Sequence, residues 1–143
     1  GEDTRKTFAA QLHKALCNEN IVTFIDDNLR KGKDVGISLE KAIKSSRISI
    51  VVFSETYATS KWCLQELAQI MQCRRYKNQV VIPVFYEVDP SDVRKQKGSY
   101  ETAFARYKME ADTSEKFMET VDGWKAALTE AANISGWDSR IYG

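Results

Sequence analysis

The sequence has 143 residues, of which 43% are hydrophobic and 29% charged, a balance typical of one globular domain with one core. Its net charge of +1 gives no strong overall field, so partners such as nucleic acid or an anionic membrane are not indicated. No apolar run approaches the ~20 residues of a membrane-spanning helix, and no signal peptide is visible.

Cysteine and histidine are scarce, which narrows the chemistry. Cys17, Cys63 and Cys73 lie on predicted helices in apolar surroundings, and their odd number favours free, buried thiols in a reducing compartment. His13 is the only histidine, so most Ser-His-Asp, Cys-His and zinc sites are excluded and no metal is expected. Together these features predict a cytoplasmic protein, and leave the nucleus open.

The first third of the chain predicts a helix, a short strand, a polar loop and a second, short helix at 39–45. Asp3 or Thr4 begins a helix within residues 1–20, and a strand follows at 21–25. The loop at 26–36 is basic but has neither GxxxxGK[ST] nor GxGxxG, so it is not a familiar phosphate cradle. A solvated loop is the simpler interpretation, although its place after a strand also suits a functional role.

The central stretch predicts a strand followed by an amphipathic helix. Residues 48–53 form a dense apolar run, as expected of a parallel strand buried on both faces. The helix at 61–73 has an apolar face formed by Leu64, Leu67 and Met71. Beside that face, Trp62 and Glu66 are four residues apart. Ligands bind at the carboxyl ends of strands in open parallel sheets. A solvated Glu66 and a core-capping Trp62 are the ordinary alternatives, because charged residues are mostly exposed.

The remaining chain continues the alternation of strands and helices. A strand at 80–86 contains Pro83, which predicts a bulge or a less paired edge. Ser91 is the expected cap of a helix that opens in the turn at 89–92. Helices at 98–108 and 117–133, a polar loop at 110–115 and a last strand at 134–137 complete the prediction. The fold class is therefore α/β, with a parallel sheet and right-handed crossovers.

Several long motifs resemble one family. They are GEDTR at the start, FIDD followed by LxxG, RISIVVFSxxYAxSxWCLxEL, IPVFYxVDPSDVRKQxGSYxxAF and WKxALTEAAxxSGW. Together they resemble the TIR domain of plant intracellular immune receptors over the whole length, so residues 1–143 are expected to form a single TIR domain.

The resemblance implies a flavodoxin-like fold, with a five-stranded parallel sheet in the order 2-1-3-4-5 and helices on both faces. The family's first, central strand would precede GEDTR, and its final helix would follow SGW; the chain is expected to lack both. Unpaired backbone groups in a core cost about 1–3 kcal/mol each. We therefore expect the central strand to come from an upstream segment or from another chain.

The resemblance also implies enzymatic cleavage of NAD, as a substrate and not as a cofactor, into nicotinamide and ADP-ribose-type products. The family's catalytic glutamate lies in WCLxEL, which corresponds to Glu66. Trp62 would stack on a ring of the substrate, Ser54 would line the pocket floor, and Arg30 and Lys31 would lie near its phosphates. Most family members have arginine at the position of Lys31, and lysine lacks the bidentate fork.

Partners other than NAD are implied by the resemblance as well. Family members often pair through a Ser-His dipeptide on the first helix, where this chain has Ala10 and Gln11. Some relatives also act on nucleic acids, which the charge does not indicate here. We therefore expect weak self-association with other TIR domains. The alternative function is a non-catalytic TIR–TIR interaction module.

Overall fold

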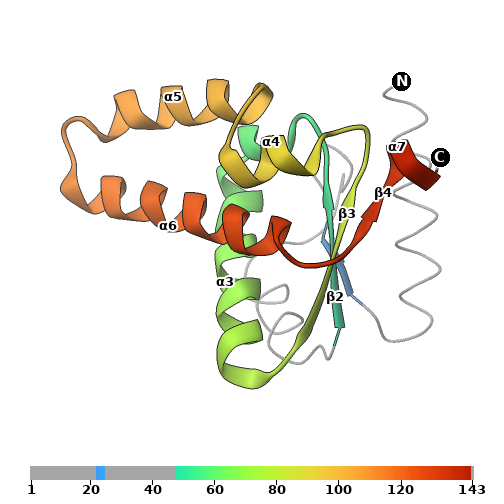
Figure 1. Cartoon of the computed structure of the whole chain (residues 1–143). Coiled ribbons are helices and arrows are strands. Elements are labelled where there is room, and N and C mark those ends of the chain that lie inside the picture. Colours follow the sequence, from blue (N-terminus) through green and yellow to red (C-terminus); the bar gives the residue numbers. More distant parts are fainter. Residues whose placement is uncertain (1–21, 25–47, 143) are drawn as a thin grey trace, which may run out of the picture.

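The computed structural model describes residues 22–24 and 48–142, which form a parallel sheet and its helices (Figure 1). The four strands pair side by side in chain order, and every pairing is parallel. They are β1 (Val22–Phe24), β2 (Ile48–Phe53), β3 (Val80–Phe85) and β4 (Trp137–Asp138). The predicted α/β class with a parallel sheet is confirmed.

The order of the strands differs from the expected one between β1 and β2. Val22 pairs with Ser49 and Phe24 with Val51, so the two strands are direct neighbours. No strand stands between them among the described residues, where the resemblance implied one. The backbone groups of β1 pair with those of β2 along residues 22–24 and 49–51. The unpaired backbone groups that we expected between these two strands are therefore absent along this pairing.

Strand β2 is buried on both faces, as its apolar run predicts. Val51 and Phe53 belong to the large core cluster under the helices, whereas Ile50 and Val52 belong to a smaller cluster on the opposite face. Two separate clusters explain why the run has no regular polar alternation, since a strand covered on both sides favours apolar residues on both faces, and Ser49 is the one polar residue of β2.

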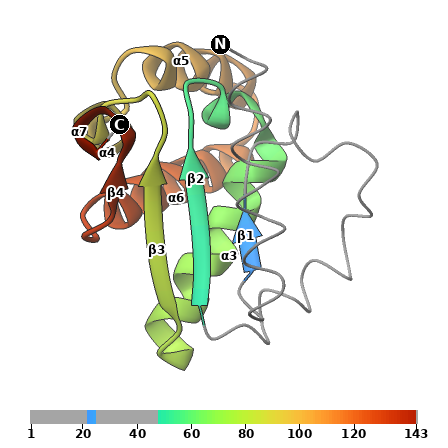
Figure 2. The ribbon, with the colours of Figure 1, turned by 90° about the vertical axis from the view of Figure 1, so that its right-hand side faces the viewer.

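Four helices of more than one turn and a 3-10 turn connect the described strands. They are η2 (Tyr57–Thr59), α3 (Lys61–Lys77), α4 (Pro90–Lys95), α5 (Ser99–Ala111) and α6 (Glu115–Ala132), and a final short helix, α7 (Ser139–Tyr142), follows β4. Figures 1 and 2 place α3 and α6 on one face of the sheet, and α5 beyond the ends of β2 and β3 to which their arrows point.

Several predicted boundaries of helices and strands were wrong by a few residues. Helix α3 runs to Lys77 and not to residue 73, and β4 begins at Trp137 and not at residue 134. Within the polar stretch 110–115, residues 110–111 end α5 and residue 115 begins α6, so the predicted loop is shortened to 112–114. Polar residues on the exposed side of a helix end look the same as a loop in the sequence, which explains these errors.

The cap of α4 is Asp89 and not Ser91. The Asp89 side chain accepts a hydrogen bond from the backbone N–H of Ser91 at 2.8 Å, and Pro90 occupies the first helical position. Proline is favoured there because its missing N–H would be unpaired in any case. Pro83 in β3 is explained as well: β4 pairs only with Val84 and Phe85, so at Pro83 β2 is the only described strand that pairs.

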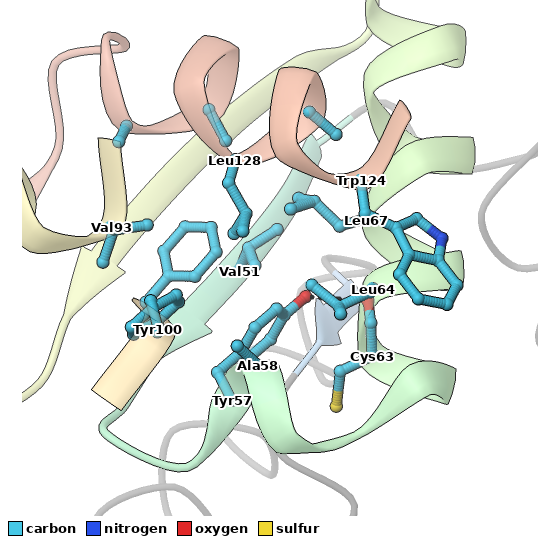
Figure 3. Close-up of a cluster of buried hydrophobic side chains, with 14 of the residues drawn as sticks. Val51, Tyr57, Ala58, Cys63, Leu64, Leu67, Val93, Tyr100, Trp124 and Leu128 are labelled. Carbon is cyan, nitrogen blue, oxygen red and sulfur yellow. Dashed lines mark hydrogen bonds between the residues drawn. The ribbon is translucent and has the colours of Figure 1, made fainter. Parts of the chain in front are cut away.

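The large core lies between the sheet and the helices (Figure 3). Leu64, Leu67 and Met71 of α3 are fully buried, as their spacing predicts. Each such side chain contributes about 1.5–3 kcal/mol by leaving water. Trp124 of α6 packs edge-on against Tyr107 of α5, with ring centroids 5.5 Å apart. These contacts fix α3 against α5 and α6.

The predictions for residues 1–21 and 25–47 lie outside the described residues. They concern the first helix with Ala10, Gln11, His13 and Cys17, the basic loop with Arg30 and Lys31, and the helix at 39–45.

Candidate functional site

The segment at residues 54–60, which we call the site loop, connects the end of β2 to the start of α3. Ser60 begins α3, and its side-chain oxygen accepts a hydrogen bond from the backbone N–H of Cys63 at 3.1 Å. The first two turns of α3 therefore lie at the carboxyl end of the sheet, where ligands bind in open parallel folds. They carry both Trp62 and Glu66.

Glu66 is a buried carboxylate, with only 4% of its surface exposed. The alternative of a solvated helix carboxylate is therefore wrong. A buried charge needs compensation, and Glu66 does take part in a polar interaction. Carboxylates on helices are rarely buried without a purpose, so this residue is the foremost candidate for chemistry in the described part.

Trp62 lies one turn before Glu66 on α3 and is half-buried. It stands outside the two core clusters of described residues, so the core-capping alternative is not supported. Its indole Nε1 is shielded from water and has no hydrogen-bond partner among the described residues. Buried indole N–H groups usually find a partner, and an unpaired donor beside a buried carboxylate is suited to a polar ligand.

Ser54 is almost fully buried at the end of β2, with 1% of its surface exposed. Its hydroxyl lies 3.4 Å from that of Thr56, and its carbonyl oxygen accepts a hydrogen bond from the hydroxyl of Tyr100 at 2.8 Å. Its role at the floor of a substrate pocket stays a prediction. Arg30 and Lys31 lie outside the described residues, so their relation to Glu66 stays a prediction.

The second buried acid, Asp138, has a structural explanation. Its two carboxylate oxygens accept hydrogen bonds from Arg140, at 3.3 Å from Nε and 3.0 Å from a terminal nitrogen. These bonds lower the pKa of Asp138. The pair therefore stabilises the fold above about pH 4, and this contribution is lost as the pH falls through the lowered pKa. Because Arg140 already occupies both oxygens, Asp138 is a poor candidate for catalysis.

Sequence reasoning missed the residues that hold the site loop. Tyr57, Tyr100 and Tyr107 each donate a hydrogen bond to a backbone carbonyl of this loop or of the first turn of α3. Tyr100 and Tyr107 lie on the helix predicted at 98–108, but nothing in the sequence assigns partners to their hydroxyls. Only the choice of tyrosine over phenylalanine at these buried positions is a usable signal.

Metal binding and membrane insertion find no support in the described part of the chain. Between residues 48 and 142, and in β1, no three acidic, cysteine or histidine side chains gather as a metal site. None of the helices in these ranges is long and apolar enough to cross a membrane. Cys63 and Cys73 are free and buried, as predicted.

The open parallel sheet with helices packed on it defines an α/β domain, consistent with the flavodoxin-like class. It carries a buried glutamate and a half-buried tryptophan at its carboxyl edge. A family model of the TIR domain matches residues 1–142. The chain belongs to the TIR domain family.

Similar proteins agree with this assignment. Disease resistance protein RPV1 of Vitis rotundifolia is 50% identical over 137 residues, covering 96% of this chain and 9% of that protein. TMV resistance protein N of Nicotiana glutinosa is 49% identical over 140 residues, covering 95% of this chain and 12% of that protein. The chain thus spans only about a tenth of the length of these curated relatives.

The fold also matches a solved structure. The TIR domains of the activated Roq1 resistosome, which directly recognises the pathogen effector XopQ, are 47% identical to this chain with a TM-score of 0.77. The match covers 98% of this chain and 83% of that one. The described residues therefore have the same fold as these TIR domains.

Proposed function

We propose that this TIR domain cleaves the bond between nicotinamide and ribose in NAD, and that Glu66 is its catalytic carboxylate. One observation carries the proposal: Glu66 is a buried carboxylate on the first turns of α3, at the carboxyl edge of a parallel sheet. The glutamate of the WCLxEL motif has this role in the family that the sequence resembles. The likeness to relatives named for disease resistance supports a signalling role in plant immunity.

The reaction needs little more than a well-placed carboxylate. As the bond from the ribose C1′ to the pyridinium nitrogen breaks, its electron pair goes to nitrogen and nicotinamide leaves as a neutral molecule. Positive charge then develops on the ribose, as in glycoside hydrolysis. Glu66 stabilises that charge and holds a ribose hydroxyl, while water adds its oxygen to C1′ and releases a proton. Because the leaving group needs no proton, no general acid such as histidine is required.

The other site residues have binding roles in this proposal. Trp62 stacks on a ring of the substrate, and Ser54 closes the floor of the pocket. Arg30 and Lys31 approach the phosphates, with Lys31 acting as a point charge because an ammonium group cannot form the bidentate contact.

Replacing Trp62 tests the binding role. We expect Trp62→Ala to raise KM for NAD about tenfold, because one stacked ring contributes roughly 1–3 kcal/mol. A half-buried side chain outside the core should cost less stability than a core tryptophan. If Trp62 served packing alone, the melting temperature would fall while KM of the remaining activity stayed at the wild-type value.

A non-catalytic interaction module is the alternative function, because the structural relative is itself an assembly of TIR domains. Following nicotinamide release from NAD at increasing protein concentration separates the two functions. We expect release to rise faster than linearly, since Ala10 and Gln11 weaken pairing and copies associate with a Kd above about 1 μM, or −8 kcal/mol. A protein that self-associates at these concentrations but releases no nicotinamide would establish the interaction module.

A further inference from the structure

Three tyrosine hydroxyls fix the backbone around the site loop. Tyr100 of α5 donates to the carbonyl oxygen of Ser54 at 2.8 Å, and Tyr107, two turns later on the same helix, donates to that of Ala58 at 2.6 Å. Tyr57, within the loop, donates forward to the carbonyl oxygen of Cys63 at 3.1 Å. Helix α5 thus holds the loop at two points that are four residues apart.

The two hydroxyls of α5 have a task that packing does not explain. Tyr100 is 0% and Tyr107 5% exposed, and their rings belong to the core cluster that phenylalanine would fill equally well. The carbonyl oxygens they bind are buried by the same core, where an unpaired polar group is costly. Burial raises the pKa of the Tyr107 hydroxyl, so it remains a proton donor over the physiological range.

The site loop determines where α3 begins. Its last residue, Ser60, caps the helix through the N–H of Cys63, and the hydroxyl of Tyr57 holds the carbonyl of that same residue. Figure 3 shows Tyr57 lying between Val51 of β2 and the first turn of α3. Glu66 follows Cys63 by three residues, so a shift of the loop changes the position of the Glu66 carboxylate directly.

We propose that Tyr100 and Tyr107 are positioning residues for the active site, which act through the site loop and α3 on Glu66. The inference rests on the proposed function, because it assigns these hydroxyls to the geometry of NAD cleavage. Neither residue touches the substrate. Their effect comes from the precision that a catalytic carboxylate requires, about 0.5 Å in position.

The test uses Tyr100→Phe, Tyr107→Phe and the double variant, which remove only the hydroxyl groups. We expect kcat to fall about tenfold in each single variant, less than the ~10²-fold that follows a full 1 Å misplacement. KM should change less than about threefold. Stacking of a substrate ring on Trp62 depends less on a small tilt of α3 than the hydrogen bond between Glu66 and a ribose hydroxyl does.

Hydrogen exchange of the site loop is a second measurement, which needs no substrate. The backbone N–H groups of Tyr57, Thr59 and Ser60 all donate within the site loop, so their hydrogen exchange reports how firmly the loop is held. We expect about tenfold faster exchange in the variants, the factor that corresponds to losing one ordinary hydrogen bond.

Thr129→Val is the matched control. The hydroxyl of Thr129 on α6 donates to the carbonyl oxygen of Arg94 at 2.9 Å and accepts from the side-chain amide of Gln96 at 3.4 Å. This part-buried hydroxyl therefore ties α6 to α4 and not to the site loop. We expect this variant to lose similar stability while kcat and the exchange of the loop stay at wild-type values.

The outcomes separate the two proposals. If wild-type protein releases no nicotinamide, the proposed function fails, and faster loop exchange in the tyrosine variants would still establish that α5 holds the loop. If wild-type protein is active and the tyrosine variants match it in kcat and loop exchange, the positioning role is wrong. It is equally wrong if Thr129→Val lowers kcat as much as they do, because the effect would then be one of general stability.

Discussion

Nicotinamide release should fall by at least about 10²–10³-fold in Glu66→Ala, the loss expected when one group that stabilises transition-state charge is removed. Glu66 and Asp138 are the two buried acids among the described residues, and the Asp138 carboxylate is held by Arg140, which leaves Glu66 as the buried acid available for chemistry. Release is measured by chromatography at a protein concentration where the wild type is active.

Two further variants make this result interpretable. Glu66→Gln keeps the shape of the side chain and removes its charge, and it should be as inactive as Glu66→Ala. Gln72→Ala changes an exposed residue on the same helix and should leave activity unchanged. The assignment of Glu66 would be wrong if either Glu66 variant retained comparable activity while remaining folded by circular dichroism.

Gly136→Ala should lower the free energy of unfolding strongly. A Cβ atom at Gly136 would lie 2.6 Å from the Cγ atom of Pro83 and closer still to the carbonyl oxygen of the same residue. Backbone of β3 cannot move aside as a flexible side chain can, so we expect a cost of about 3 kcal/mol. The melting temperature should fall by about 10 °C.

Gly123→Ala is the control for this prediction. Gly123 lies in α6, and nothing lies within 4 Å of the position that an alanine Cβ atom would take, so alanine fits without contact. Alanine also favours a helix over glycine by about 0.5–1 kcal/mol, and the variant should melt slightly above the wild type. Equal melting of Gly136→Ala and wild type would show that the chain at Gly136 does not approach Pro83 this closely.

Local sequence patterns predicted an element correctly where the pattern is typical of only one kind of secondary structure. The apolar run at 48–53 implied a strand covered on both faces, and Leu64, Leu67 and Met71 implied the core face of α3; both were confirmed. The direct pairing of β1 with β2 was not predictable, because strand order depends on contacts between distant residues and no local pattern encodes it.

The site was predictable only in part, for a physical reason. Motif resemblance pointed to Glu66 and Trp62, but helical spacing alone favoured a solvated carboxylate, and only the tertiary packing around α3 buries it. The hydroxyls of Tyr100 and Tyr107 were missed because a tyrosine looks like any other core aromatic until its partner is known. Asp89 was passed over as a cap because a neighbouring serine satisfies the same pattern.

The most direct test of the account is a crystal structure of this domain with carba-NAD, in which a carbon atom replaces the ring oxygen of the nicotinamide-bearing ribose and prevents cleavage. We expect a hydroxyl of that ribose within about 2.6–3.2 Å of the Glu66 carboxylate, with a ring of the analogue stacked on Trp62. An analogue bound away from Glu66, by a preparation that cleaves NAD, would contradict the claim that this buried carboxylate performs the reaction.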